Sequence, residues 1–329
     1  MQSIKSRIIN FILRNRHLLR FKLRKPVFDF NSSIADFRRE CEEGAAKYGR
    51  VPEGVSVTGG EISGVRAEWL MPAGAPSDRI IMYVHGGGYV SGSCADHRGF
   101  VARFAAGCGY NTLTYEYRLA PEHPFPAAVD DSVSVYRALI SSKYSPENVI
   151  IAGESAGGGL TLALLLALKE KGLPLPAAAV AISPWTDLKC ESESYRTKNK
   201  VSLAPLNSWI VFGKYYSGSA NPSNPLISPL YGELSGLPPI LINSGTDDEL
   251  YDDGKNFYLK AKAAGADVRF RSGEGMVHCY PLLAPMFPEA SEAMDEIVEF
   301  IREHFSRYSK CTETSSKAER SAAPPPAQG

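Results

Sequence analysis

The sequence predicts an α/β protein in which a mostly parallel central sheet carries helices on both faces. Short apolar runs at 79–84, 112–117, 149–152, 178–183 and 239–244 alternate with longer stretches that are typical of helices. Because parallel neighbours need a crossover connection, this rhythm favours repeated strand–helix–strand units. The chain has 329 residues, 44% of them hydrophobic, which is enough for one large core or two small ones.

Two predicted features come before this alternation. Residues 34–48 have the spacing of an amphipathic helix, and we place its charged residues on the exposed side: Arg38, Arg39, Glu40, Glu42 and Glu43. Alternating apolar residues between 55 and 70 predict paired antiparallel strands. The remaining predicted elements are helices at 98–108, 127–143, 160–171, 255–264 and 290–304, and a strand at 268–271.

Composition and motifs argue against several classes of protein. Formal net charge is zero and the pI is about 7.0, so nothing indicates a nucleic-acid partner. The sequence has no G-x-x-x-x-G-K-[ST] loop and no G-x-G-x-x-G, and it lacks H-E-x-x-H and paired C-x-x-C motifs. We therefore expect no cofactor and no metal site.

The cysteines and the hydropathy pattern predict a cytoplasmic protein. No apolar run is long enough to span a bilayer. The cysteines lack the spacing of a disulfide framework, which favours free thiols in a reducing compartment. They are Cys41, Cys94, Cys108, Cys190, Cys279 and Cys311.

The first 25 residues carry many basic residues and no acidic one. Apolar residues recur among them at helical spacing, namely Ile4, Ile8, Phe11, Ile12, Leu18 and Leu19. A secretory signal peptide is a poor fit, because Arg14 and Arg16 interrupt the apolar region. We expect this helix to pack its apolar face on its own domain. Weak contact with an anionic membrane surface is the alternative.

Two further segments fall outside the alternation. Residues 187–224 are too long for a plain connection, so we expect an insertion that lies over the site, with a helix around 206–216. Residues 309–329 have too little apolar content to pack, and they end in Pro-Pro-Pro-Ala-Gln-Gly. This composition predicts a disordered tail.

The sequence Gly153-Glu154-Ser155-Ala156-Gly157 lies between the predicted strand at 149–152 and a long helical run. Strand, G-x-S-x-G and helix in this order are typical of a nucleophile elbow, although G-x-S-x-G alone also occurs in ordinary turns. So sharp a turn brings Gly153 and Gly157 together and leaves no room for side chains there. The following helix places its unpaired N–H groups and positive dipole end beside Ser155. We therefore predict Ser155 as a nucleophile.

A second glycine motif supplies candidate donors for a negatively charged oxygen. His85-Gly86-Gly87-Gly88 follows the strand at 79–84, and its backbone N–H groups can point into a site without hindrance. Such a run forms one half of the oxyanion hole beside a nucleophile elbow, and the N–H after the serine forms the other half. That second donor here is Ala156.

A general base is expected after the nucleophile and the acid along the chain. His278 lies in a glycine-containing loop after the strand at 268–271, at an edge where catalytic groups gather in open α/β sheets. His304 lies within the last predicted helix, where a solvated side chain is the simpler interpretation. We therefore predict His278 as the base.

The imidazole needs a carboxylate partner. Asp247 and Asp248 both follow the strand at 239–244, and their spacing does not separate them. Asp252 and Asp253 come at the start of the next helix, where they are more simply explained as N-terminal caps. Two candidates for the acid therefore remain open on the residues alone.

Several motifs together resemble the hormone-sensitive-lipase family of bacterial esterases (family IV) in the α/β-hydrolase superfamily. They are His85-Gly-Gly-Gly-Tyr, Tyr117-Arg-Leu-Ala-Pro-Glu-His-Pro-Phe-Pro-Ala-Ala, Gly153-Glu-Ser-Ala-Gly-Gly, Ser183-Pro-Trp-Thr-Asp-Leu, Asp248-Glu-Leu-Tyr-Asp and Val277-His278. The similarity runs from about the second N-terminal helix to the last helix. Three positions depart from the family pattern: Glu154 replaces Asp or Thr, Glu249 replaces Pro, and Cys279-Tyr280 replaces Gly-Phe.

The resemblance implies an α/β-hydrolase fold with a helical cap and a complete catalytic set. It assigns Ser155 as nucleophile, His278 as base and Asp248 as acid, with Gly87, Gly88 and Ala156 as the oxyanion hole. It divides the chain into N-terminal cap helices (1–50), a catalytic core (51–186 and 225–308), an inserted cap segment (187–224) and the tail (309–329).

The resemblance further implies a serine carboxylesterase that hydrolyses short- to medium-chain acyl esters through an acyl-enzyme, without a cofactor. A small-molecule ester is the expected partner, and a homodimer is a further possibility. Two alternatives stay open. One is an amidase or peptidase that uses the same residues, and the other is a non-catalytic ligand-binding relative, against which the presence of His278 counts.

Overall fold

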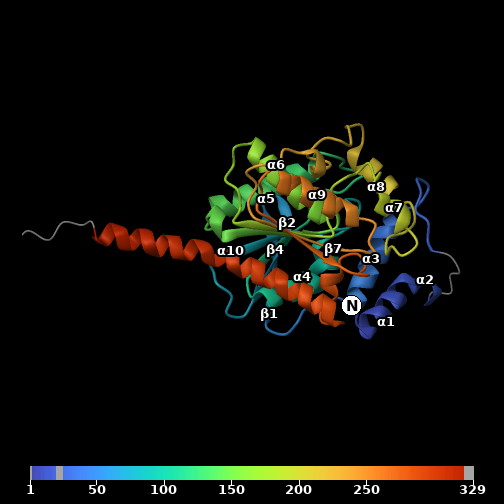
Figure 1. Cartoon of the computed structure of the whole chain (residues 1–329), viewed down its shortest axis with the longest axis horizontal. Coiled ribbons are helices and arrows are strands. Elements are labelled where there is room, and N and C mark those ends of the chain that lie inside the picture. Colours follow the sequence, from blue (N-terminus) through green and yellow to red (C-terminus); the bar gives the residue numbers. More distant parts are fainter. Residues whose placement is uncertain (1, 20–24, 322–329) are drawn as a thin grey trace, which may run out of the picture.

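A single eight-stranded sheet forms the centre of the molecule (Figure 1), a computed structural model that describes residues 2–19 and 25–321. The strand order is β1-β2-β4-β3-β5-β6-β7-β8, with antiparallel pairing of β2 to both β1 and β4 and parallel pairing elsewhere. The strands are β1 (Val55–Ile62), β2 (Val65–Pro72), β3 (Ile80–Val84), β4 (Asn111–Tyr115), β5 (Val149–Glu154), β6 (Ala178–Ile182), β7 (Ile240–Gly245) and β8 (Val268–Gly273). The predicted α/β class is confirmed.

Helices cover both faces of the sheet, as the alternation of elements predicts. One face carries α5 (Ala127–Ser141), α6 (Ala156–Glu170) and α9 (Tyr251–Ala263). The other carries α4 (Cys94–Cys108) and α10 (Pro288–Ser321). The remaining helices are α1 (Ile4–Arg14), α2 (Arg16–Leu19), α3 (Ile34–Tyr48), α7 (Glu193–Thr197) and α8 (Ser208–Ser217), with 3-10 turns at Pro146–Asn148, Pro229–Tyr231 and Tyr280–Leu283.

Strand β3 shows why its residues form a continuous apolar run. Ile80, Met82 and Val84 pack in the core beneath α5, α6 and α9, whereas Ile81 and Tyr83 pack against α4 and α10. Successive side chains of a strand point to opposite faces, and both faces of this sheet are covered, so every residue of β3 is buried.

Two local predictions differ from the structure. Helix α4 begins at Cys94 rather than near residue 98, because Ser93 and Asp96 form a capping box at its N-terminus. Arg38 of α3 was expected on an exposed face but is half-buried. Its guanidinium donates to the carbonyl groups of Val90 and Ala120 and forms an ion pair with a glutamate.

The N-terminal segment and the inserted segment 187–224 lie together, although they are far apart in sequence. Leu206 N–H donates to the carbonyl of Pro26, and Phe28 N–H donates to the carbonyl of Leu206, both at 2.9 Å. The aromatic rings of Phe28 and Phe37 lie 4.9 and 5.2 Å from the ring of Phe212 in α8. The two segments therefore share one small apolar cluster.

Helix α1 packs on the protein with its polar face, which corrects the expectation that its apolar face is the buried one. Ser6 and Asn10 are buried: Ser6 Oγ donates to Glu289 at 3.0 Å, and Asn10 Nδ2 donates to the carbonyl of Gly275 at 3.2 Å. The outward residues are apolar, with exposed fractions of 75% at Ile4, 55% at Ile8, 66% at Phe11 and 47% at Ile12. Ile9 and Leu13 also pack against an apolar cluster around Met276 and Phe287, so polar contacts and a small apolar contact together set the orientation of this helix.

The C-terminal segment also differs from its prediction. Helix α10 continues to Ser321 and extends beyond the rest of the molecule (Figure 1), so residues 309–321 are helical rather than disordered. This stretch has no Pro or Gly, and it contains helix-forming Ala, Glu and Lys, a composition that favours helix. The remainder of the predicted tail, residues 322–329, lies outside the described residues.

We predict that deleting residues 309–329 changes the free energy of unfolding by less than about 0.5 kcal/mol, because this part of α10 extends away from the core. By contrast, Phe305→Ala in the same helix should cost about 3–5 kcal/mol, since the ring of Phe305 is fully buried beside Tyr110. Urea unfolding of the two variants measures both values. A large loss on truncation would contradict this description of α10.

Candidate active site

Ser155 occupies a sharp turn between β5 and α6, with φ 58° and ψ −124°. A non-glycine residue adopts such a conformation only when its surroundings hold it there. A Cβ on Gly153 would lie 2.5 Å from the carbonyl oxygen of Gly157, and a Cβ on Gly157 would lie 2.1 Å from that of Val84. The two glycines of G-x-S-x-G are therefore required by close backbone contacts, and the turn has the geometry of a nucleophile elbow.

The glycine loop, His85 to Gly88, lies against this elbow. An added Cβ on Gly86 would approach Ser155 Cβ to 3.2 Å. Gly87 and Gly88 have φ values of 109° and 65°, which glycine adopts readily. Within the described residues, no protein acceptor pairs with the N–H groups of Gly87, Gly88 or Ala156. Three backbone donors are thus available beside Ser155.

His278 and Asp248 form a hydrogen-bonded pair, with 2.8 Å between Nδ1 and Oδ2. Asp248 is buried, and its other oxygen accepts the N–H of Leu250 at 3.0 Å. Asp247 points elsewhere and forms ion pairs with Arg14 and Lys198, at 2.7 and 3.2 Å. Of the two aspartates between which the sequence could not choose, Asp248 is therefore the one that pairs with His278.

Residues after β6 connect His278 with the elbow. Ser183 Oγ accepts the N–H of Cys279 at 3.0 Å, and Trp185 N–H donates to the carbonyl of Ser155 at 3.1 Å. Cys279 adopts φ 53°, in the region that favours glycine, and glycine is the usual residue there in the family that the sequence resembles. The carboxyl ends of β5, β6, β7 and β8 thus bring these residues together at one edge of the sheet.

The environment of His278 favours its charged form. Burial alone would lower the pKa of His278, but the negative charge of Asp248 and its hydrogen bond raise it above the ordinary value of 6.5. The imidazole is also 5.8 Å from the indole of Trp209, whose Nε1 donates to Glu249 at 2.8 Å. The ring is therefore held between a carboxylate and an aromatic wall.

Three residues that the sequence treated as peripheral are buried or bridging. His304 is only 1% exposed and its Nδ1 contacts the carbonyl of Phe300, so the expected solvated position is wrong. Asp253 does not cap α9, because its Oδ2 accepts the N–H groups of Thr186 and Asp187. Asp252 accepts the N–H of Ser194 instead. Both aspartates tie α9 to the inserted segment, which spacing along one helix could not indicate.

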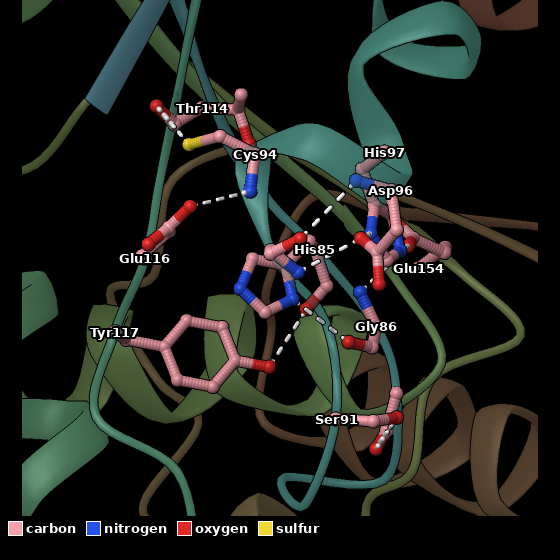
Figure 2. A network of polar contacts seen from close by, with 12 residues as sticks. His85, Gly86, Ser91, Cys94, Asp96, His97, Thr114, Glu116, Tyr117 and Glu154 are labelled. Atoms are coloured by element: carbon pink, nitrogen blue, oxygen red, sulfur yellow. Dashed lines mark hydrogen bonds and ion pairs between the residues drawn. The ribbon is translucent and has the colours of Figure 1, made fainter. Parts of the chain in front are cut away.

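A buried polar network beside the glycine loop was also missed (Figure 2). The carboxylate of Glu154 accepts the N–H of Gly86 at 2.6 Å and lies 3.2 Å from His97 Nε2, while His97 Nδ1 contacts Asp96. The one signal in the sequence is the S-x-x-D capping box from Ser93 to Asp96, which marks the start of α4. It gives no hint that His97 turns toward Glu154.

The aromatic cluster of the N-terminal and inserted segments lies directly over the glycine loop. A Cβ on Gly88 would approach Phe212 Cδ2 to 2.5 Å. Beside this cluster is a cavity of about 350 Å³, lined among others by Leu13, Phe28, Phe37 and Leu203. Among the described residues, no group of three or more His, Cys, Asp or Glu side chains could hold a metal ion.

Residues 81–282 match the family described as alpha/beta hydrolase fold. The chain belongs to this family. It is 40% identical to an acetyl-hydrolase of Streptomyces hygroscopicus over 77% of this chain and 83% of the relative. The match to the family extends from β3 to the 3-10 turn after His278, so it contains the elbow, the glycine loop and the Asp248–His278 pair.

Solved structures narrow the family assignment to the hormone-sensitive-lipase branch. A crystal structure of an esterase from the bacterial hormone-sensitive lipase family superposes with a TM-score of 0.83 at 36% identity, and the match covers 93% of this chain and 99% of that one. A crystal structure of EstE5 soaked with p-nitrophenyl butyrate superposes with a TM-score of 0.83 at 34% identity, and the match covers 93% of this chain and 100% of that one. The resemblance seen in the motifs is thus confirmed.

Proposed function

We propose that this chain is a serine carboxylesterase that hydrolyses acyl esters through an acyl-enzyme intermediate on Ser155. The observation that carries this proposal is the Asp248–His278 hydrogen bond, together with the strained turn at Ser155. Such a pair can orient an imidazole as a base and stabilise the imidazolium that forms. Relatives named as an acetyl-hydrolase and as esterases support ester hydrolysis.

In the proposed reaction, Ser155 Oγ attacks the ester carbonyl while His278 takes its proton. The tetrahedral oxyanion is stabilised by the N–H groups of Gly87, Gly88 and Ala156, with help from the positive end of the α6 dipole. His278 then protonates the departing alcohol, and the acyl group stays on Ser155. Water, deprotonated by His278, attacks this acyl-enzyme, the bond between the acyl carbon and Ser155 Oγ breaks, and His278 returns the proton to Oγ as the acid is released.

We propose that residues 1–50 and 187–224 act as a cap over the core formed by residues 51–186 and 225–308. The contacts that join Phe28, Phe37 and Phe212, and the approach of Phe212 to Gly88, support this division. A roof this close to the oxyanion donors limits the room for a long acyl chain. We therefore propose a preference for short- to medium-chain esters.

The outward face of α1 supports a second proposal, contact with an anionic lipid bilayer. Four large apolar side chains are exposed on this helix, each worth about 1.5–3 kcal/mol if fully buried. Lys5 and Arg7 are exposed beside them, and the first acidic residue of the chain is Asp29. Basic residues add about 1 kcal/mol each near an anionic surface. Since no helix in the described part of the chain could cross a bilayer, α1 would lie on its surface.

We propose a cytoplasmic location for this protein. Five cysteines of the described residues are free thiols, namely Cys41, Cys94, Cys108, Cys190 and Cys279. Free thiols persist in a reducing compartment, which supports this location. An anionic cytoplasmic leaflet would also present the surface that α1 fits.

The first experiment measures hydrolysis of p-nitrophenyl esters from acetate to palmitate, together with matched anilides, by the wild type and Ser155→Ala. We expect turnover of short esters to exceed that of the anilides, and Ser155→Ala to remove it while the melting temperature stays unchanged. Unchanged hydrolysis by Ser155→Ala would exclude the nucleophile. Faster turnover of palmitate than of butyrate would exclude the short pocket, and faster anilide cleavage would favour the amidase alternative.

The pH profile tests the pairing of His278. Because the base must be neutral and its pKa is raised, kcat/KM should decline with falling pH through a pKa above 6.5. Asp248→Asn removes the neighbouring charge, so kcat should drop roughly 10³- to 10⁴-fold and the residual acid limb should move to lower pH. Asp247→Asn is the matched control and should leave the limb in place. Equal shifts in both variants would contradict the assignment of Asp248.

Vesicle flotation tests the membrane proposal. Wild-type protein should bind phosphatidylglycerol vesicles and not pure phosphatidylcholine vesicles, and Ile8→Glu/Phe11→Glu should reduce binding by more than about tenfold. Leu259→Glu, at an apolar residue that is 52% exposed on α9, is the control and should bind like the wild type. The proposal fails if the wild type binds neither kind of vesicle. If light scattering then shows a dimer that the double variant does not form, a second copy of the chain covers α1 instead.

A further inference from the structure

A chain of three side chains, one buried and two partly buried, links the glycine loop to helix α4 through the last residue of β5. None of the three belongs to the Ser155, His278 and Asp248 set. Figure 2 shows Glu154, His97 and Asp96 clustered near Gly86. Glu154 Oε1 accepts the N–H of Gly86 at 2.6 Å and lies 3.2 Å from His97 Nε2. The Glu154 side chain is 6% exposed and the His97 side chain 18%.

The helix cap fixes the far end of this chain. Asp96 Oδ1 contacts His97 Nδ1 and also accepts the N–H of Ser93 at 2.8 Å. Ser93 Oγ in turn accepts the N–H of Asp96 at 3.1 Å. Asp96 therefore cannot rotate without breaking the cap of α4, and it sets the direction in which His97 points.

The geometry makes His97 a cation between two carboxylates. Burial would lower the pKa of His97, but hydrogen bonds to Asp96 and Glu154 raise it to about 10. His85, stacked on Tyr117 and 5.0 Å from His97, is held neutral because burial lowers its pKa to about 4. Tyr83, Tyr117 and Cys279 also interact with Glu154, and burial raises the pKa of each, so all three are neutral.

A carboxylate immediately before Ser155 has two opposite effects on an oxyanion. Its charge-assisted hydrogen bond to Gly86 is short and strong, and it fixes the loop that carries the next two N–H groups. Its negative charge, uncompensated, would repel the oxygen that becomes negative during the reaction. A protonated His97 removes the second effect and keeps the first.

We propose that the Glu154–His97 ion pair positions the glycine loop for oxyanion binding and cancels the charge beside the nucleophile, without touching the substrate. This inference rests on the proposed function. Glu154 and His97 are positioning residues, because they act through Gly86. Their pairing also explains how the chain accommodates Glu154 at a position where the hormone-sensitive-lipase family usually has Asp or Thr.

Steady-state kinetics of Glu154→Ala and Glu154→Gln test the positioning role. The alanine removes the acceptor for Gly86, so kcat should fall roughly ten- to a hundredfold, somewhat less than the 10²- to 10³-fold cost of deleting an oxyanion donor, and KM should change less than about threefold. The glutamine keeps an oxygen for Gly86 and should recover most of kcat. A loss in KM alone, or equal losses in both variants, would overturn the proposal.

Glu68→Gln is the matched control for loss of a buried ion pair. Glu68 is 5% exposed and pairs with Arg98, the neighbour of His97 on α4, at 2.6 and 2.9 Å. It does not contact the glycine loop, so this variant should lose stability but keep kcat. If Glu68→Gln and Glu154→Ala lower kcat equally, the effect is structural and the proposal fails.

The acid limb of the kcat/KM profile separates charge from structure. Glu154→Gln removes one negative charge near His278 and should move the limb to lower pH by roughly half a unit, whereas His97→Gln removes one positive charge and should move it upward by a similar amount. The double variant should return close to the wild type. Identical limbs in all variants would overturn the charge role. If His97→Gln does not fold, comparison of the acid limbs of Glu154→Gln and Glu68→Gln tests the charge role. A wild type without esterase activity would instead refute the proposed function itself.

Discussion

The close contact between Gly157 and the backbone of Val84 and His85 is the constraint on which the site depends. It lets α6 begin directly after the turn, and it presses the end of β5 against the end of β3. Ser155 can hold φ 58° only because this contact and the packing around it fix the chain on both sides. A methyl group at residue 157 would separate the nucleophile from the glycine loop.

Close packing also shapes the rest of the site. The glycine loop passes close to both Phe212 and Ser155, so the aromatic cluster and the serine turn lie against the same short segment. Two of the three departures from the family pattern have a specific hydrogen-bonding partner: Glu154 contacts His97 and Gly86, and Glu249 accepts the indole N–H of Trp209. Buried charges are tolerated here because each is hydrogen-bonded.

Helix α1 shows that amphipathic spacing does not say which face is buried. Its serines and Asn10 bind partners on α10 and on the loop after β8, and Arg14 binds Asp247. Ile4, Ile8, Phe11 and Ile12 remain exposed, whereas Ile9 and Leu13 pack against the protein. The fold thus presents a basic and apolar ridge, which a rule based on apolar burial alone would have placed inside.

The sequence by itself determined the α/β class, the order of the elements and the turn at Ser155, because strand–helix alternation and glycine spacing are local properties of the chain. It left Asp247 and Asp248 equivalent, since adjacent residues share a position and only the three-dimensional path of their side chains separates them. It misjudged His304, Asp253 and Arg38, whose partners lie in other segments or on the inner side of a helix. It also misjudged residues 309–321, where low apolar content predicted disorder but the chain continues as helix. Only the tertiary structure joined Glu154 to His97, because the two are distant in sequence and meet where β5 and α4 approach the same loop.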